Sequence, residues 1–589
     1  MILDRILNPS NVQSLSQQEL KELSHALRKF IIESVLESGG HFAANLGVIE
    51  LTVALYHTLN FNQHKLIWDV GHQSYPHKVL TGRKSLLNTI RSLNGLSGFP
   101  KIGESPYDHF GTGHSSTALS AAMGMATYNK LNNNNQIAVA VIGDGAFTAG
   151  LTFEALNNLW DSNLNVWIIL NDNQIGIDPN TGALNSHLKA QHTEQLKQFY
   201  AFFGSSYHGP IDGHDLDQLI PALESLKSAS GPQLLHIKTV KGKGFPEAEK
   251  EQTKWHSAAK FVKIEGQKDA QAKHAIKWQD AFGKIMLKIA ENRAEIIGIT
   301  PAMPSSCGMQ LAMDIFPNRF FDVGIAEQHA LTFAAGFATS GARPFVNIYS
   351  SFLQRAYDQW IHDVALQNLP VTLCIDRAGL VGEDGPTHHG AYDISFLRCI
   401  PNQKIAAPKD AEELAAIMTW SLNQTGPVVI RYPKGNIPDT DFIQQYEFSE
   451  MDQDSNIISE PKIISPIVPN KPVILSTGHA TNLAIKGNTH GIGHIHFPFI
   501  HHDAYPQFLE LISLATAIIT IEDGSLQGGW GMGISSEIKQ KYEYLKIKNL
   551  GIPHQFVTHG NNQNLYEICG YSPRDIEREI ENFLSNPQY

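Results

Sequence analysis

Short apolar runs rich in Val and Ile recur along this chain and alternate with longer stretches of helical periodicity. Continuous apolar strands that are separated by helices indicate parallel sheets with both faces covered. We therefore expect an α/β fold built from doubly wound, mostly parallel sheets. The runs that predict strands are residues 137–142, 166–170, 234–240, 296–299, 344–348, 371–375, 428–430, 473–475 and 517–521.

Two polar stretches interrupt this alternation. Residues 241–277 are rich in Lys, Gly, Glu and Gln, and residues 435–469 are polar and end in a stretch with several prolines. Neither has a sustained apolar period, so both are typical of linkers. A chain of 589 residues also exceeds what one core normally organises. We predict three domains, at residues 1–277, 278–450 and 451–589.

The beginning of the chain predicts an amphipathic helix. Ser16 and Glu19 have the spacing of a capping box, and Leu20, Leu23 and Leu27 then follow at helical intervals. We expect this helix to contribute packing only.

Charge and composition exclude several classes of protein. The net charge of -12 is spread along the chain without a Lys/Arg run, so neither nucleic acid nor an anionic membrane has a docking stripe. No apolar run reaches the roughly 18 residues of a spanning helix, and the N-terminus lacks a signal-peptide pattern. The four cysteines form no Cys-x-x-Cys pair. These features predict a cytoplasmic globular enzyme with reduced thiols.

Polar side chains follow two neighbouring predicted strands. Gly143-Asp144-Gly145 comes directly after residues 137–142, and Asn171-Asp172-Asn173 comes after residues 166–170. Ligands of parallel sheets bind at the carboxyl ends of the strands. Oxygen-bearing side chains there suit a hard cation, and glycines let backbone N–H groups approach phosphates. A lone Gly-Asp-Gly is more often an ordinary turn, so the prediction depends on the pair.

A carboxyl group, Glu327, lies in the segment Gly324-Ile325-Ala326-Glu327-Gln328-His329, after the predicted strand at 321–323. A glutamate at the start of a helix also interacts favourably with the helix dipole, so a structural role is an alternative to a catalytic one.

The paired loops resemble the thiamine-diphosphate signature of the transketolase superfamily. This resemblance implies that Glu327 hydrogen-bonds to the cofactor's pyrimidine N1′ and promotes the tautomer that removes the proton from thiazolium C2. It further implies Mg²⁺ ligands at Asp144, Asn173 and the Ile175 carbonyl, diphosphate contacts at Gly145 and Ala146, and a bulky support for the bent cofactor at Ile177.

Further motifs narrow the resemblance to the 1-deoxy-D-xylulose-5-phosphate synthase family over nearly the whole chain. These motifs are residues 38–42, 68–78, 113–116, 349–359, 376–379, 384–388 and 431–435. The family implies a homodimer that condenses pyruvate with D-glyceraldehyde 3-phosphate, with decarboxylation, to 1-deoxy-D-xylulose 5-phosphate, the first step of the methylerythritol-phosphate isoprenoid pathway. Neither nucleic acid nor membrane is an expected partner.

The same family resemblance implies roles for individual residues. Diphosphate contacts are expected from His72, Gly113, His114, Ser115 and Lys250, and Phe352 is expected to stack on the pyrimidine. The substrate cavity would be lined by His41, His72, His256, Tyr349, Asp384 and His388. Arg355, Arg377 and Arg431 would surround the substrates, with Arg377 and Arg431 on the acceptor phosphate, because guanidinium groups suit phosphate. The alternative for each arginine is an ordinary ion pair.

One segment departs from the family pattern. Between Asn173 and His256 the chain is several tens of residues shorter than the family leads us to expect. We hypothesise that this loss leaves the chemistry intact but alters water exclusion and the control of catalysis by the acceptor.

The C-terminal third is rich in histidine. His490, His494, His496, His501, His502 and Asp503 invite a metal interpretation, but none has the spacing of paired helical ligands. We expect a solvated surface there.

Two other functions remain open from the sequence. The first is a paralogous thiamine-diphosphate carboligase or transketolase with another acceptor, which product analysis would distinguish. The second is a catalytically silent protein that binds the cofactor for regulation. The intact set of Glu327, Asp144 and Asn173 argues against the second.

Overall fold

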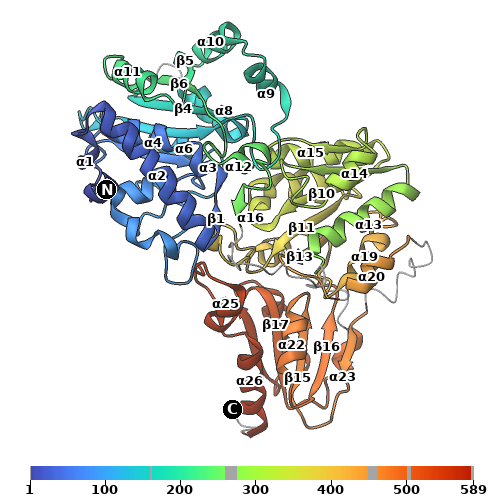
Figure 1. The fold of residues 1–589 in the computed structure, drawn as a ribbon. Coiled ribbons are helices and arrows are strands. Elements are labelled where there is room, and N and C mark those ends of the chain that lie inside the picture. The colour runs from blue at the N-terminus through green and yellow to red at the C-terminus, as the bar shows by residue number, and fades with distance from the viewer. Residues whose placement is uncertain are drawn as a thin grey trace. The chain divides into compact units, whose positions relative to one another are not determined.

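The computed structural model describes residues 2–159, 162–258, 275–438, 440–448, 460–500 and 506–585. Its contacts divide the chain into two compact units (Figure 1). The first unit is Met1–Gln267 with Gly324–Ala326, and the second is Lys268–Val323 with Glu327–Tyr589.

The first unit is organised around a parallel five-stranded sheet of order β2-β3-β4-β6-β5. Its strands are β2 (Lys65–Asp69), β3 (Ala138–Gly143), β4 (Val166–Asp172), β5 (Ser206–Asp212) and β6 (Gln233–Lys238). A separate antiparallel pair joins β1 (Gly40–His41) to β7 (Ser257–Ala258). The helices are α1 (Ser10–Gln13), α2 (Gln17–Ser38), α3 (Ala43–Leu46), α4 (Ile49–Thr58), α5 (Tyr75–Lys78), α6 (Thr117–Leu131), α7 (Asp144–Phe147), α8 (Gly150–Leu159), α9 (Gly182–Lys189), α10 (Thr193–Phe202), α11 (Leu216–Lys227) and α12 (Pro246–Lys250).

Successive residues of β3 and β4 belong to two different cores. Val139 and Val141 pack into a cluster with residues of α2, α4 and α11, whereas Ala138 and Ala140 pack with residues of α6 and α8. Side chains of a strand alternate between its faces, so this division shows helices on both sides of the sheet. The doubly wound architecture expected from the apolar runs is therefore confirmed in this unit.

The N-terminal helix begins as its capping box predicts. The Ser16 side chain accepts a hydrogen bond from the Glu19 amide, and the Glu19 carboxylate accepts one from the Ser16 amide, at 3.4 and 2.9 Å. Leu20, Leu23 and Leu27 of α2 are buried, in agreement with a packing role.

The second unit contains two sheets. The first is parallel, with order β12-β13-β11-β10-β8-β9, and consists of β8 (Ile296–Thr300), β9 (Phe320–Asp322), β10 (Arg343–Tyr349), β11 (Thr372–Ala378), β12 (Lys404–Ala406) and β13 (Val428–Pro433). Its helices include α13 (Trp278–Asn292), α14 (Gln310–Ile315), α15 (Glu327–Thr339), α16 (Ser350–Leu353), α17 (Tyr357–Gln359), α18 (Asp393–Leu397), α19 (Ala411–Ser421) and α20 (Thr440–Gln445). We call this the second sheet.

The third sheet has the order β14-β16-β15-β17-β18 and is parallel except at β14. It consists of β14 (Lys462–Ser465), β15 (Val473–Thr477), β16 (Gly493–Phe497), β17 (Ala517–Ser525) and β18 (Lys546–Ile552), with helices α22 (Ala480–Gly487), α23 (Pro506–Leu511), α24 (Trp530–Lys541), α25 (Asn562–Cys569) and α26 (Pro573–Ser585). Figure 1 shows β15, β16 and β17 with α22 and α26 in the orange and red part of the chain.

One hydrophobic core joins the second and third sheets. It includes Ile299 and Val346 of the second sheet together with Leu475, Ile495 and Ile518 of the third. The two sheets thus belong to one compact unit, while the division of the chain into three domains stays a prediction. Across the described parts of the chain, no helix is both long enough and apolar enough to cross a membrane.

Part of the first predicted linker is ordered. Residues 241–258 contain α12 and β7, and Lys241 is buried. Residues 259–274, in the same stretch, lie outside the described part of the chain.

Candidate functional site

Asp144 occupies the carboxyl end of β3, where the first residues of α7 turn its side chain inward. Its carboxylate accepts hydrogen bonds from the amides of Gly145, at 2.9 Å, Asn173, at 3.2 Å, and Gln174. The Asn173 side-chain oxygen in turn accepts a bond from the Ile175 amide at 3.2 Å. The loops after β3 and β4 are therefore joined around one carboxylate.

The surroundings of this carboxyl group disfavour its charged form. Burial, followed by the nearby Asp172 charge, raises the pKa of Asp144 to about 7. One oxygen of Asp172 is buried and has no hydrogen-bond partner among the described residues. Asp144 and Asp172 are buried carboxyl groups at the carboxyl ends of the neighbouring strands β3 and β4, and Asn173 beside them is half-buried. Such a group of oxygen atoms fits a divalent cation. The positions of Asp144, Asn173 and Ile175 thus fit the predicted role of these residues as Mg²⁺ ligands.

The predicted diphosphate loop at residues 113–115 is anchored to the end of β2. The Asp69 carboxylate accepts hydrogen bonds from Ser116 at 2.7 Å and Ala118 at 3.0 Å, which fixes the start of α6. Gly113 and Ser115 are buried and His114 is half-buried. Ile177, in the loop after β4, is half-buried. Ala146, in α7, is buried.

Three predicted histidines meet in the first unit. The His41 ring lies 5.7 Å from that of His72 and 5.9 Å from that of His256, and the rings of His72 and His256 are 5.1 Å apart. The pairing of β1 with β7 brings His41 beside the segment of His256. Residues separated by more than two hundred positions thus form one cluster of imidazoles.

A buried lysine, Lys241, joins this cluster and was not singled out from the sequence. Its ammonium group donates to the Gly176 carbonyl and to His256 Nδ1, the latter at 3.2 Å. Burial lowers the pKa of Lys241 to about 8, although Asp144 and Asp178 oppose the shift. By contrast, Lys250, the predicted diphosphate contact, is exposed at the end of α12. The sequence feature that could have identified Lys241 is its position shortly after strand β6, where functional residues of parallel sheets are expected.

In the second unit, Glu327 is the first residue of α15 and only 5% exposed. Burial raises the pKa of this carboxyl, and the charge of Arg355 partly opposes the shift. Its Oε2 atom is buried and has no hydrogen-bond partner among the described residues. A buried polar atom without a partner is costly, so Glu327 suits a ligand that brings a hydrogen-bond donor or acceptor.

Four further predicted residues gather at the carboxyl ends of β10 and β11. The rings of Tyr349 and Phe352 are stacked 5.6 Å apart, and His388 meets Phe352 edge-on at 5.4 Å. The Arg377 guanidinium lies 4.2 Å from the centre of the Tyr349 ring. This group combines flat apolar faces with a cation and an imidazole, which suits an aromatic heterocycle beside an anionic substrate.

Arg377 and Arg431 differ in their surroundings. Arg377 is paired with Asp376 and donates to the Ser306 carbonyl at 3.0 Å. Arg431 is 2% exposed, donates from Nε to Asp393 at 3.1 Å and is also paired with Asp523. Arg431 therefore forms the buried ion pair that the sequence allowed as the alternative to phosphate binding.

A second cation, Lys434, stands three residues after Arg431 and was not assigned a role from the sequence. Its Nζ lies 3.7 Å from Asp384 and from Glu383 and donates to the Val381 carbonyl at 3.1 Å. The side chain is 34% exposed. Because Asp384 is a predicted substrate residue, Lys434 lies at the edge of the predicted cavity.

The expectation of a solvated histidine surface in the C-terminal third is wrong for two residues. His494 and His496 are fully buried in β16. His494 is bonded to Ser476 at 2.7 Å, and His496 to Thr481 and Glu413 at 2.7 and 2.9 Å. Every residue of β16 is buried, so its polar side chains lie in the core together with its apolar ones. His501, His502 and Asp503 lie outside the described residues.

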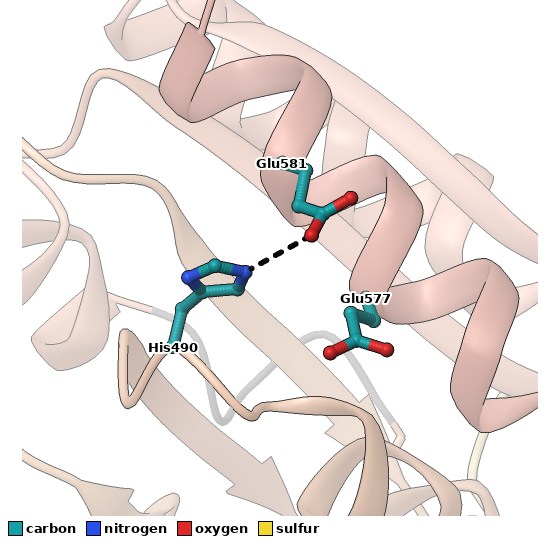
Figure 2. A group of neighbouring side chains, drawn as sticks. All are labelled: His490, Glu577 and Glu581. Carbon is teal, nitrogen blue, oxygen red and sulfur yellow. Dashed lines mark ion pairs between the residues drawn. The ribbon is translucent and has the colours of Figure 1, made fainter.

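Among the described residues of this histidine group, His490 is exposed. Figure 2 shows it opposite Glu577 and Glu581 of α26, with an ion pair of 3.5 Å to Glu581. The three could supply metal-ligand atoms within 4.8 Å of one another. Exposed acidic groups near a histidine are adequately explained by solvent and the ion pair, so this cluster carries no metal assignment.

Comparison with known proteins agrees with this architecture. Residues 3–201 and 191–239 match the family model described as 1-deoxy-D-xylulose-5-phosphate synthase, and residues 274–440 match that of the transketolase pyrimidine binding domain. The 1-deoxy-D-xylulose-5-phosphate synthase of Cytophaga hutchinsonii is 43% identical over 634 aligned residues, covering 99% of this chain and 98% of that protein. The synthase of Hahella chejuensis is 40% identical, covering 99% and 95%.

Among solved structures, transketolase from Leishmania mexicana has 16% identity and a TM-score of 0.45, covering 97% of this chain and 98% of that one. The sequence relatives, together with the sheets described above, define a transketolase-like α/β protein that binds thiamine diphosphate. Within that class, the chain belongs to the 1-deoxy-D-xylulose-5-phosphate synthase family.

Proposed function

We propose that this protein condenses pyruvate with D-glyceraldehyde 3-phosphate, releasing carbon dioxide and forming 1-deoxy-D-xylulose 5-phosphate. Family membership supports this reaction. The structural observation that carries it is Glu327, a buried carboxyl group at the start of α15 with one oxygen that has no hydrogen-bond partner in the described part of the chain.

Separate groups of residues fit the diphosphate end and the pyrimidine end of thiamine diphosphate. Asp144, Asn173 and the Ile175 carbonyl would hold Mg²⁺, and Gly145, Ala146 and the 113–115 loop would contact the diphosphate. Glu327 would hydrogen-bond to the pyrimidine N1′, and Phe352 would stack on that ring. When bound, the cofactor supplies an electron sink for decarboxylation of the 2-oxo acid.

The protein's own groups orient substrates and move protons. His41, His72, His256 and His388 are suited to proton transfer near neutral pH, because imidazoles change protonation there. We assign to Lys241 the diphosphate contact first predicted for Lys250, because Lys241 is buried and is bonded to the Gly176 carbonyl, in the loop after β4, and to His256.

We assign recognition of the acceptor phosphate to Arg377 and Lys434, which are not enclosed between two buried carboxylates as Arg431 is. Arg377 stands over Tyr349, and Lys434 lies near Asp384. Arg431 is already neutralised by Asp393 and Asp523, so we assign it a structural role. Arg355 acts on the Glu327 carboxyl through its charge.

The test is an assay of purified protein with Mg²⁺, thiamine diphosphate and labelled pyruvate, with and without D-glyceraldehyde 3-phosphate. We expect labelled 1-deoxy-D-xylulose 5-phosphate and carbon dioxide in equal amounts. Faster formation of a different product from another aldehyde than from D-glyceraldehyde 3-phosphate would favour the paralogous carboligase. Cofactor binding without carbon dioxide release would favour the regulatory protein.

The family resemblance also supports a homodimer. Light scattering on the cofactor-loaded protein should give twice the chain mass of 65.1 kDa. A monomeric mass at micromolar concentration would contradict this part of the proposal.

A further inference from the structure

The loop between β11 and α18 carries two predicted substrate residues, Asp384 and His388. Its base is closed by reciprocal backbone hydrogen bonds between Gly379 and Gly390, at 2.9 and 2.7 Å. A 3₁₀ turn, Gly385–Thr387, lies between the two substrate residues. We call residues 379–390 the substrate loop. Bonds at the base do not by themselves set the position of the rest of a loop, which depends on the contacts made further along it.

His389 supplies such a contact from inside the loop. Its Nδ1 accepts a hydrogen bond from the Val381 amide at 3.1 Å, and its Nε2 donates one to the Thr558 carbonyl at 3.1 Å. One partner is an obligatory donor and the other an obligatory acceptor, so the ring must be neutral with its proton on Nε2. Burial lowers the pKa of His389 to about 4, which is consistent with this form.

Thr558 belongs to the segment between β18 and α25, on the side of the third sheet. The same segment touches the loop at two further points. The Gly560 amide donates to the Gly382 carbonyl at 3.4 Å, and a Cβ placed on Gly385 would lie 2.9 Å from the Cβ of His559. Gly385 also has a φ of +70°, so only glycine fits this approach without strain. The segment between β18 and α25 therefore packs directly against the substrate loop.

We propose that His389 is a positioning residue: by bridging Val381 to Thr558, it lets the third sheet hold the loop that presents Asp384 and His388. The inference rests on the proposed function, because it takes Asp384 and His388 as substrate residues. His388 meets the Phe352 ring edge-on, so a displaced loop would also disturb that aromatic group. Displacements of about 1 Å in such groups can cost on the order of a hundredfold in rate.

The test compares His389→Leu with His389→Gln. Leucine leaves the Val381 N–H and the Thr558 C=O without partners. Glutamine can restore both bonds, because its amide carries one acceptor and one donor on neighbouring positions, as the imidazole does. His554→Leu, at an exposed position of the same segment, is the matched control.

The first measurement is hydrogen exchange of peptides covering residues 379–391 in the cofactor-free protein. We expect faster exchange in His389→Leu, and exchange like the wild type in His389→Gln and His554→Leu. This measurement does not depend on activity, so it tests His389 even if the proposed reaction proves wrong.

The second measurement is steady-state kinetics. We expect His389→Leu to lower kcat by about tenfold to a hundredfold, with the KM for pyruvate changed less than about twofold, and His389→Gln to recover most of the loss. If His389→Leu does not fold, the exchange and kcat of His389→Gln test the proposal: wild-type values support it, and impaired values contradict it. Unchanged exchange and kcat in His389→Leu, or a His389→Gln variant as impaired as His389→Leu, would overturn the proposal.

Discussion

At the scale of single residues, Glu327 has the environment that most suggests chemistry. It is buried at a helix start, where an ordinary dipole-stabilising glutamate would be solvated, and one of its oxygens lacks a partner among the described residues. The raised pKa of this carboxyl keeps it able to share a proton with a heterocyclic nitrogen.

Glu327→Gln should therefore abolish the proton exchange that Glu327 promotes while preserving shape. We expect carbon dioxide release from pyruvate to fall by about 10²- to 10⁴-fold, the usual contribution of a positioned acid or base. Hydrogen–deuterium exchange at the thiazolium C2 of the bound cofactor should slow in parallel. Binding of the cofactor, measured by calorimetry, serves as the control, and a variant as active as the wild type would contradict the role.

Lys434 should affect affinity for the acceptor. Lys434→Ala removes one charge-assisted hydrogen bond, worth about 1.5–3 kcal/mol, so the KM for D-glyceraldehyde 3-phosphate should rise by about tenfold or more. The KM for pyruvate should be unaffected, and Lys434→Arg should retain affinity. An unchanged acceptor KM in Lys434→Ala would exclude this residue from phosphate binding.

Arg431 should affect stability instead. Arg431→Met leaves Asp393 and Asp523 buried without their cation, which should reduce the free energy of unfolding by about 3–5 kcal/mol. Thermal unfolding of the cofactor-free protein measures this loss. A variant with wild-type thermal stability but a raised acceptor KM would restore the phosphate-binding role first predicted for Arg431.

At the scale of elements, the segment between Asn173 and His256 is short but ordered. It consists of α9, α10, β5, α11, β6 and α12, and β5 extends the sheet edge beside β6. Tyr200 of α10 packs edge-on against Phe147 at 5.6 Å, which ties α10 to the helix that begins with Asp144. The family match is split into two pieces that overlap at residues 191–201, inside this segment.

Single-turnover kinetics should reveal the effect of this short segment. We expect steps before decarboxylation to resemble those of the Cytophaga hutchinsonii relative, and the dependence of carbon dioxide release on D-glyceraldehyde 3-phosphate to differ. The comparison needs both proteins under identical conditions. The same acceptor dependence in both would reject the hypothesis.

At the scale of the whole molecule, the second and third sheets are joined by polar as well as apolar contacts. Glu413 of α19 is bonded to His496 of β16 at 2.9 Å and lies 3.0 Å from Lys462 of β14. Burial alone would raise the pKa of Glu413, but His496, Lys409 and Lys462 outweigh it and hold the pKa well below its ordinary value of 4.5.

The contribution of Glu413 should depend on pH. A carboxyl whose pKa is lowered by folding stabilises the fold above its unfolded pKa, and this stabilisation is lost as the pH falls below about 4.5. Glu413→Gln should therefore lower the thermal unfolding temperature at pH 7, with a loss of about 3–5 kcal/mol, and the difference from the wild type should persist down to about pH 4.5 and shrink progressively below it. A difference that is constant with pH would mean that the charge of Glu413 does not matter.

Local sequence was sufficient wherever a residue's role depends on its immediate neighbours. The long apolar runs predicted strands such as β3, β4 and β10, and the polar residues that directly follow them predicted the position of Asp144, Asn173 and Tyr349. The strand β2 was missed, because Lys65–Asp69 has a charged residue at each end and Ile67 is its one β-branched residue. Without the Val and Ile that mark the other predicted strands, this run does not stand out from a loop.

Tertiary structure decided every role that depends on a partner distant in the sequence. Arg431 is neutralised by Asp393 and Asp523, His496 is buried against Glu413, and Lys241 rather than Lys250 is enclosed. Burial and pairing are set by which segments pack together, and no local pattern encodes that choice. The sequence by itself determined the fold class and the strand ends where chemistry is expected, whereas only packing decided which charged side chains are left to bind a ligand.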